Sequence, residues 1–281
     1  MQDLTNRDCS VCGAQDHRLL MQDGDSAYRS CVRCQAIFAS PLSTAYEAVN
    51  DATYAAALTR YVAKIDTKLH ANLRALRPFD RYRLTNRFLE VGCNAGATLL
   101  AARRLGWQPT GVDIARAPTA YAREELGMDV FTGTVEAAGL PDDTFDVAYS
   151  NAVLEHVEQP VRTLLAIRRT LRPGGVFFAD TVNWDSYTRR ILGIHWRYLD
   201  PGHHVQLFTP GNVHELARRT GFTVLWVRTS GVRLSDRKRG ETWSAPWYLH
   251  LAKAPLSLAT RVSGRGDSIR FLLRKPENTT A

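Results

Sequence analysis

Four cysteines near the N-terminus form the pattern with the most definite chemistry. They make two Cys-x2-Cys pairs separated by eighteen residues, at Cys9, Cys12, Cys31 and Cys34. Four thiolates at this spacing predict a tetrahedral zinc site, which is structural because no position stays open for a substrate. A segment of about forty residues buries too little apolar surface to fold alone, so zinc would supply much of its stability. The alternatives are reduced thiols without metal and, less in keeping with a cytosolic chain, two disulfides.

A second pattern lies in the segment FLEVGCNAGATLLA, which reads as a buried strand, a glycine-bearing turn and the start of a helix. Such turns bind nucleotide-like ligands at the helix N-terminus. The dinucleotide fingerprint requires three glycines, but its positions hold Gly92, Asn94 and Ala97. Glu90 would repel a pyrophosphate, whereas it suits a ligand with an ammonium and a sulfonium. Asp113 ends the next apolar stretch, where an acid bonds ribose hydroxyls, so adenosine without phosphate fits both acids.

The pattern of Glu90, Gly92, Asn94 and Gly96, followed by Asp113, resembles the first two motifs of the class I S-adenosylmethionine (SAM) dependent methyltransferases. Three further segments resemble later motifs of that family in the right order: GTVEAAGLPDDTFDVAYSNAVLEHVEQP, LRPGGVFFAD and HVQLFTPGNVHELARRTGF. The resemblance covers most of residues 86–228. It implies that the chain binds SAM and transfers its methyl group.

The resemblance also assigns roles at the first two strand ends. It places Gly92, Asn94 and Gly96 around the methionyl and ribose groups of SAM. Glu90 is expected near the amino group, directly or through water. Asp113 is expected on the ribose hydroxyls.

The adenine end is less regular. Ile114 is expected to pack on the adenine ring. The family often has an Asp for the adenine amino group where this chain has Thr134, so the contact must pass to that hydroxyl, to the backbone of Val135 or to Glu136. Asn151, after the fourth strand, is expected near the methionyl end.

The motif LEHV resembles the polyprenyl-catechol O-methyltransferases, in which Glu-x-x-Glu-His binds a divalent metal near the acceptor oxygens. The first acid of that triplet is Ala152 here, so only Glu155 and His156 remain and no catalytic metal is expected. We expect these two side chains to bond to the loop and fix the start of the next helix, and a catalytic role beside the acceptor is the alternative.

Methyl transfer to a hydroxyl requires a positioned acceptor and a group that removes its proton. Histidine titrates near neutral pH, and His204 matches the family's His-x-x-x-Phe-Thr segment, so we predict His204 as the general base and His203 as second choice. A structural role for His204 is the alternative. Further candidates are Asp185, Tyr187 and His195.

Alternating strands and helices predict an α/β, Rossmann-like sheet of seven strands with helices on both faces. The expected strands are 87–92, 109–113, 128–132, 145–150, 175–181, 222–228 and a last antiparallel one in SIRFLLRKP, and the helices include 96–106, 116–126, 160–171 and 211–220. Ligands of such sheets bind at the carboxyl ends of the strands.

We expect a zinc ribbon over residues 1–42, a helical cap over 43–85 and the SAM-binding core over 86–281. In related enzymes such a cap covers the methionyl group, which makes Tyr54 and Tyr61 candidates for that contact, although core packing is the commoner role. Two insertions, at about 182–208 and 229–266, are rich in aromatic residues. They predict walls of an acceptor pocket or, alternatively, a homodimer contact or a shallow membrane anchor.

The formal net charge of +8 arises mainly from scattered arginines, so it argues little for nucleic acid. The one local basic cluster could meet an anionic substrate and comprises Arg233, Arg237, Lys238 and Arg239. No apolar run approaches the eighteen residues that would span a bilayer, and the N-terminus has no apolar leader, so the expected location is cytoplasmic.

These patterns together predict a SAM-dependent methyltransferase with a structural zinc. The expected acceptor is a small molecule: a hydroxyl or activated carbon of a specialised metabolite, sugar nucleotide or glycan. Sugar C-methyltransferases carry a similar cysteine pattern but have a further C-terminal domain, so their substrate does not transfer. The rivals are an RNA methyltransferase that uses the ribbon as a clamp and a SAM-fold protein that only binds a partner.

Overall fold

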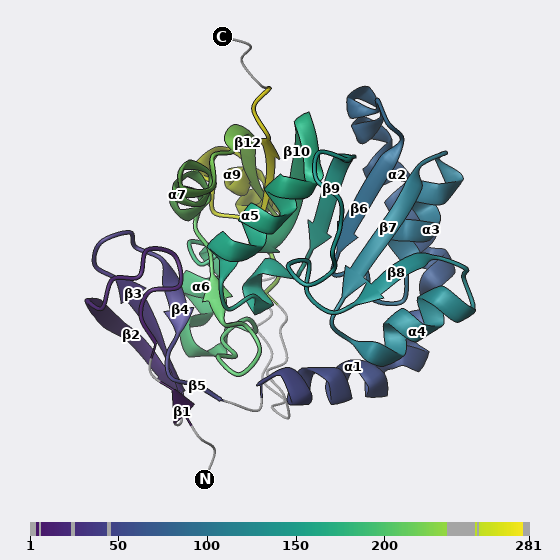
Figure 1. Cartoon of the computed structure of the whole chain (residues 1–281). Coiled ribbons are helices and arrows are strands. Elements are labelled where there is room, and N and C mark those ends of the chain that lie inside the picture. The colour runs from purple at the N-terminus through teal and green to yellow at the C-terminus, as the bar shows by residue number, and fades with distance from the viewer. Residues whose placement is uncertain are drawn as a thin grey trace.

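The computed structural model describes residues 4–5, 7–23, 26–43, 46–234, 251 and 253–277. In this part of the chain a seven-stranded sheet forms the centre of the molecule, with helices on both faces (Figure 1). Its strands, in spatial order, are β12 (Thr223–Ser230), β13 (Ser268–Arg274), β10 (Leu171–Val182), β9 (Phe145–Asn151), β6 (Arg87–Val91), β7 (Gln108–Asp113) and β8 (Asp129–Thr132).

Strands β6 to β10 run parallel to one another, whereas β13 pairs antiparallel with both β10 and β12. The direction of strand progression reverses at β6, which lies between β7 and β9. Ligands of open α/β sheets bind at this switch point, outside the carboxyl ends of the strands. The predicted Rossmann-like sheet with an antiparallel last strand is confirmed.

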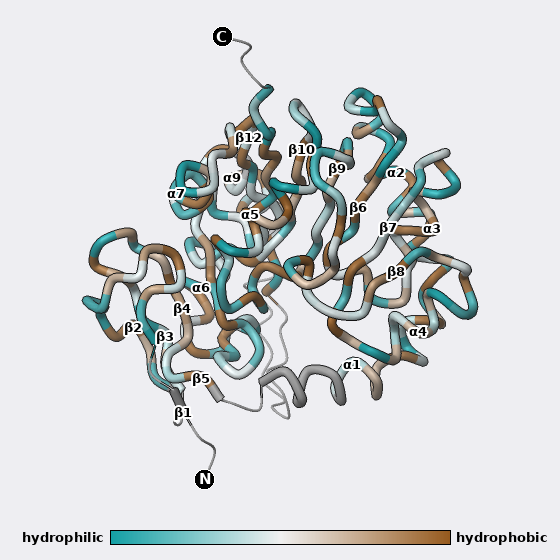
Figure 2. The backbone as a smooth tube through the Cα atoms, in the orientation of Figure 1, coloured by the Kyte–Doolittle hydropathy of each residue, from teal (hydrophilic) through white to brown (hydrophobic). Residues whose placement is uncertain are grey.

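Both faces of the sheet are covered because the central strands carry buried residues at consecutive positions, and successive side chains of a strand point to opposite faces. On β6, Phe88 packs with the α2 and α3 side of the molecule, and the next residue, Leu89, packs with Leu164 of α5 on the opposite side. Figure 2 shows hydrophobic stretches along these strands. The helices are α1 (Tyr46–Val62), α2 (Ile65–Leu76), α3 (Ala97–Arg104), α4 (Arg116–Glu124), α5 (Pro160–Thr170), α6 (Tyr187–Leu192), α7 (Pro210–Thr220) and α9 (Lys253–Ser263), with 3-10 turns η1 (Arg77–Tyr82), η2 (Leu154–His156) and η3 (Gly193–His195).

The ends of α7 show how local chemistry sets an element's bounds. The Thr209 hydroxyl accepts from the Asn212 backbone N–H, and the Asn212 side chain accepts from the Thr209 backbone N–H. This capping box satisfies donors that the first helical turn leaves without partners. Gly221 follows the helix with a left-handed φ of 71°, which ends it.

Most predicted bounds of the core elements differ from the structure by two residues at most, but the start of one strand is wrong. The strand expected over 175–181 begins at Leu171, which already pairs with Phe145 before a break in the register, and pairing resumes at Val176. Two glycines, Gly174 and Gly175, interrupt the apolar pattern there, so the pattern did not indicate that the strand begins at Leu171.

Three N-terminal strands and β11 form a four-stranded sheet in the order β11 (Gln206–Leu207), β4 (Ile37–Ala39), β3 (Ser26–Cys31) and β2 (His17–Asp23). A short pair, β1 (Leu4–Thr5) with β5 (Leu42–Ser43), lies beside it. The strand β11 comes from the first insertion and pairs antiparallel with β4, far from it in sequence. In Figure 1 the N-terminal strands therefore lie against the part of the chain that contains α6.

The second insertion lies partly outside the described residues, which exclude 235–250 and 252. Arg237, Lys238 and Arg239 of the basic cluster are in that stretch. Arg233 is described, and its guanidinium donates to the Tyr198 hydroxyl at 3.1 Å. Among the helices that the structure describes, none is long and apolar enough to cross a bilayer.

Candidate functional site

A cavity of about 750 Å³ opens at the carboxyl ends of β6, β7 and β9, where the strand order reverses. Nine of the residues predicted to bind the cofactor line it: Glu90, Gly92, Asn94, Asp113, Ile114, Thr134, Val135, Glu136 and Asn151. The tenth, Gly96, is not among the lining residues and is the N-cap residue of α3. Their roles toward a ligand stay predictions, although the fold brings all of them to one place.

Glu90 provides the main electrostatic feature of the cavity. Its side chain is buried, and Oε2 has no hydrogen-bond partner. Burial raises its pKa well above the ordinary value, and Asp113 acts in the same direction, while Thr98 and Lys68 oppose them. A buried carboxylate oxygen without a partner is costly, and a cation in the cavity would relieve that cost. The ammonium of a methionyl group fits this requirement.

The turn after β6 needs glycine for space as well as for backbone conformation. Gly92 has a left-handed φ of 84°, and a Cβ there would lie 2.1 Å from a methyl of Val153. Gly96 has a φ of 83°. Glycine adopts such conformations without the steric penalty of a side chain. The backbone can therefore pass close beside a ligand at this point.

Asp113 is oriented by the turn that it closes. Its carboxylate accepts the backbone N–H of Asn94 at 2.8 Å and that of Ala115 at 2.9 Å, each on a different oxygen. Burial raises its pKa, and the two N–H donors act against that rise. A carboxylate has about four acceptor positions, so further donors such as ribose hydroxyls can bind to it.

Helices α1 and α2 cover the cavity from one side. Tyr54 and Tyr61 both line it, with ring centroids 6.5 Å apart, and burial raises the pKa of Tyr54 to about 12. Lys68 and Asn72 also line it, and sequence reasoning missed them. The available signal was helical spacing, because Ile65, Lys68 and Asn72 follow one face of α2.

Ile114, which follows β7, lines the cavity and exposes 44% of its surface. An apolar side chain that is exposed at a cavity mouth suits contact with a flat heterocycle. Glu136 accepts a hydrogen bond from the Thr163 hydroxyl of α5 at 2.6 Å, so part of its acceptor capacity is already used. We therefore expect the hydroxyl of Thr134 and the backbone of Val135 to be the better candidates for the adenine contact, which stays a prediction.

Three predicted catalytic residues form one cluster beside the cavity. A carboxylate oxygen of Glu155 and ring nitrogens of His156 and His204 all lie within 4.8 Å of one another. His156 lines the cavity, whereas His204 is not among the described residues that border it. A carboxylate with two imidazoles is also a donor set that could hold a divalent ion. Sequence reasoning missed this third donor because His204 lies far along the chain from Glu155.

The hydrogen bonds of the two imidazoles define their tautomers. Nδ1 of His156 lies 2.7 Å from the carbonyl oxygen of His203, and Nδ1 of His204 lies 3.0 Å from that of Tyr198. A carbonyl only accepts, so Nδ1 carries the proton in each ring and Nε2 is the basic nitrogen. Burial lowers the pKa of both histidines, which favours their neutral forms.

Glu155 is buried and accepts a hydrogen bond from the Thr181 hydroxyl at 2.7 Å. Burial raises its pKa. His203, the second candidate base, contacts Asp200 at 3.2 Å through Nδ1 and does not border the cavity. The remaining candidates, Asp185, Tyr187 and His195, are also absent from the described lining.

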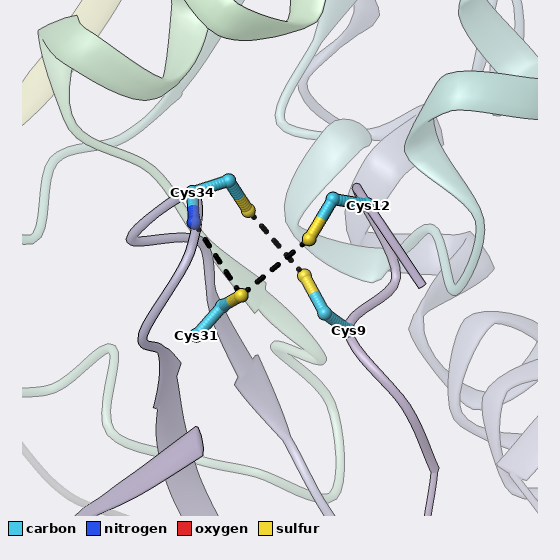
Figure 3. A group of neighbouring side chains, drawn as sticks. All are labelled: Cys9, Cys12, Cys31 and Cys34. Atoms are coloured by element: carbon cyan, nitrogen blue, oxygen red, sulfur yellow. Dashed lines mark hydrogen bonds between the residues drawn. The ribbon is translucent and has the colours of Figure 1, made fainter. Parts of the chain in front are cut away.

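The four N-terminal cysteines converge from two similar loops (Figure 3). The Sγ atoms of Cys9 and Cys34 are 3.5 Å apart, as are those of Cys12 and Cys31. These distances exceed a disulfide bond, and all four thiols are free. Burial raises the pKa of Cys9 to about 11 and also raises that of Cys34, whereas for Cys31 the effect of burial is outweighed by hydrogen bonds, and its pKa is lowered. A bound cation would stabilise the thiolates, as zinc does in four-cysteine sites.

Comparisons with known proteins agree with this geometry. A family model described as a methyltransferase domain matches residues 52–227, which leaves the cysteine pairs outside the match. The chain is 32% identical over 169 residues to a ubiquinone biosynthesis O-methyltransferase of Cereibacter sphaeroides, covering 56% of this chain and 67% of that protein. A protein of the same name from Roseobacter denitrificans is 34% identical over 197 residues, covering 66% and 71%.

Two solved structures share the fold. A SAM-dependent methyltransferase from Archaeoglobus fulgidus superposes with a TM-score of 0.55 at 17% identity, covering 77% of this chain and 99% of that one. One from Methanosarcina mazei gives a TM-score of 0.52 at 15% identity, covering 72% and 98%. With the family match and the cavity at the switch point of the sheet, these likenesses lead to one conclusion: the chain belongs to the methyltransferase-domain family and is a class I SAM-dependent methyltransferase.

Proposed function

We propose that this enzyme methylates a hydroxyl oxygen of a small molecule and that the histidines beside the cavity remove the hydroxyl proton. The observation that carries the proposal is the position of two groups on one cavity. Glu90 is a buried carboxylate whose Oε2 lacks a hydrogen-bond partner, and His156 is an imidazole whose neutral form is favoured. Glu90 suits a cofactor that carries a positive charge, and His156 suits an acceptor whose hydroxyl must lose its proton.

Each of the proposed cofactor residues would contact a different part of SAM. Glu90 would hold the ammonium and Asp113 the ribose hydroxyls, while Gly92 lets the backbone approach. Ile114 and Val135 would pack on the adenine ring. Bound SAM supplies a methyl group on a positively charged sulfonium, which is already an activated electrophile.

The chain's remaining task is to orient the acceptor and take up its proton. His156 lines the cavity, Nε2 is the basic nitrogen of its ring, and the His203 carbonyl holds the ring by the Nδ1 hydrogen bond. His204, with its ring centroid 5.0 Å away, discourages a second proton on the pair. In this proposal His156 receives the proton. His204, the base predicted from sequence, packs beside the His156 ring and does not take the proton itself.

Oxygen is proposed as the acceptor atom because the relatives with 32 to 34% identity are named O-methyltransferases. The proposed substrate class is a phenol or catechol, in keeping with an imidazole base. An activated carbon is the alternative acceptor. For the four cysteines we propose one structural zinc ion, supported by the convergence of their free thiols within 4.8 Å of one another.

The test has two steps. Calorimetric titration with S-adenosylhomocysteine, with NADH in parallel, should show micromolar binding of the first ligand alone. A radiolabelled methyl-transfer screen with simple catechols such as 3,4-dihydroxybenzoate should then yield methylated product. Binding without any oxygen-methylated product across the screen would contradict the acceptor class. A mobility shift with transfer RNA at low salt would instead favour the RNA-methyltransferase rival.

A further inference from the structure

The cysteine-bearing sheet is not an independent attachment, because its edge strand is supplied by the methyltransferase core. Gln206 and Leu207 of β11 pair with Phe38 and Ile37 of β4, and the Ala39 N–H donates to the Val205 carbonyl at 3.0 Å. Pairing satisfies an edge that would otherwise stay open. This strand begins two residues after His204, so the ribbon is attached directly to the loop of that histidine.

Tyr28 of β3 makes the most specific link between the ribbon and this loop. The side chain is fully buried among apolar residues of both parts, including Trp196 and Leu199. Its hydroxyl donates to the carbonyl oxygen of His204 at 2.8 Å and accepts from the Asp200 N–H at 3.2 Å. One hydroxyl therefore bridges two backbone positions of the loop.

The same loop determines where the His204 ring lies. Its Nδ1 donates to the carbonyl of Tyr198 at 3.0 Å, and its backbone N–H donates to the carbonyl of Asp200 at 2.7 Å. A shift of the loop backbone would break the first of these bonds. The tautomer of His204 and its contact with His156 thus depend on the loop that Tyr28 holds.

A second set of contacts joins the ribbon to the cavity wall. The Gln206 side chain donates to the Ser10 hydroxyl, between two cysteines of the first loop, at 2.6 Å, and to the Glu158 carbonyl at 3.3 Å. Arg7 donates to the carbonyls of Ala39 at 2.9 Å and Val205 at 3.0 Å. Glu158 lines the cavity. The side chain of Gln206 therefore connects the first cysteine loop to a residue of the cavity wall.

We propose that the cysteine-bearing module is a positioning element of the methyl-transfer site: Tyr28 and the β4 to β11 pairing hold the loop at 198–205 so that His204 stays against His156. The expected effect on turnover rests on the proposed function, in which the two histidines take up the acceptor's proton. Cofactor affinity is independent of it, because Glu90 and Asp113 are carried by β6 and β7. The ribbon therefore acts on turnover and not on cofactor binding.

The test compares Tyr28→Phe with Arg29→Gln as a matched control. The first removes only the bridging hydroxyl, whereas the second removes a bond inside the ribbon, from Arg29 to the Ser40 carbonyl at 3.2 Å. Hydrogen exchange by mass spectrometry should be about tenfold faster over 198–207 in Tyr28→Phe and unchanged in Arg29→Gln. Exchange over β6 serves as the internal reference and should stay within about twofold of wild type.

A long-range proton–nitrogen NMR spectrum then shows which tautomer the His204 ring adopts. Wild type should show the single Nδ1–H tautomer, and Tyr28→Phe a mixture, with S-adenosylhomocysteine affinity within about twofold. An unchanged His204 tautomer in Tyr28→Phe would overturn the proposal, as would faster exchange spread evenly over the central sheet.

With 3,4-dihydroxybenzoate as acceptor, kcat of Tyr28→Phe should fall about tenfold while its KM for SAM stays the same. An unchanged kcat would overturn the positioning role and leave the methyl transfer itself standing. If no acceptor is methylated, hydrogen exchange over 198–207 and the tautomer of His204 still test whether Tyr28 holds the loop and the His204 ring.

Discussion

The imidazole rings of His156 and His204 lie with their centroids 5.0 Å apart and their planes inclined by 47°, although one follows β9 and the other precedes β11. Each ring holds its Nδ1 proton on a backbone carbonyl. A ring nitrogen of each lies within 4.8 Å of a carboxylate oxygen of Glu155. Burial, together with a proton on His156, lowers the pKa of His204. The pair is therefore suited to take up one proton and not two.

The rate of methyl transfer should keep its full value to below pH 6.5. Burial lowers the pKa of both histidines from the ordinary 6.5, so the neutral base persists as the pH falls through that value. The measurement is kcat against pH with 3,4-dihydroxybenzoate. An acidic limb with an apparent pKa above 6.5 would speak against this pair as the base.

The same shifts predict how stability depends on pH. The unfolded chain has histidines with the ordinary pKa and binds more protons than the folded one below pH 6.5. The histidine contribution to stability is therefore intact above pH 6.5 and is lost as the pH falls toward the lowered folded values. Chemical unfolding should show this loss in wild type and a smaller one in His204→Gln. Equal losses in the two proteins would contradict it.

Replacing the proposed base should abolish most of the turnover without affecting cofactor binding. We expect His156→Gln to lower kcat by a factor of about 10² to 10⁴, the usual contribution of general base catalysis. His204→Gln should have a smaller effect. The matched control is His214→Gln on the exposed side of α7, which should behave as wild type. If His203→Gln alone abolished turnover, the base would be His203.

Glu90→Gln should weaken S-adenosylhomocysteine binding by about 1.5 to 3 kcal/mol, because it removes a charge-assisted bond to the ammonium. The control is Glu125→Gln, since Glu125 is exposed and does not line the cavity. Calorimetry measures both affinities. An unchanged affinity in Glu90→Gln would mean that the ammonium binds elsewhere.

Cofactor binding should release protons. Burial raises the pKa of Glu90 well above its ordinary 4.5, so the free protein carries this carboxyl partly protonated above that pH. The ligand's ammonium would lower the pKa again and expel the proton. Titrations in two buffers of different ionisation enthalpy should show release in wild type and little in Glu90→Gln. Proton uptake on binding would exclude this account.

The protein should contain one zinc ion per chain when it is purified without chelator. Cys12→Ser should reduce that content and lower the unfolding temperature by several degrees, because zinc supplies stability that so small a sheet lacks. Cys93→Ser is the control for metal content, since Cys93 lies outside the cysteine cluster. Elemental analysis that found far less than one zinc per wild-type chain would remove the site.

Much of the fold follows from local chemistry. The alternation of apolar runs and amphipathic stretches predicts the parallel sheet, and the turn after Glu90 predicts a cavity at the switch point. Both depend on residues close in sequence, where periodicity and backbone restrictions act directly. The same holds for the two cysteine loops. Residues assigned to the cofactor, such as Asn94 and Asp113, lie along that cavity, while their contacts with SAM stay predictions.

Contacts between distant segments could not be read in this way. The third member of the cluster, His204, reaches Glu155 only because the 182–208 insertion folds back toward the end of β10, where Asn183 bridges to Phe208. Likewise β11 completes the ribbon sheet, and Lys68 lines the cavity only because α2 packs beside α3. Local patterns define the elements from nearby residues, whereas the packing of whole layers sets which elements meet, and no short stretch of sequence encodes that. The ligand turn and the thiol loops are thus properties of the sequence, and the histidine pair is a property of the fold.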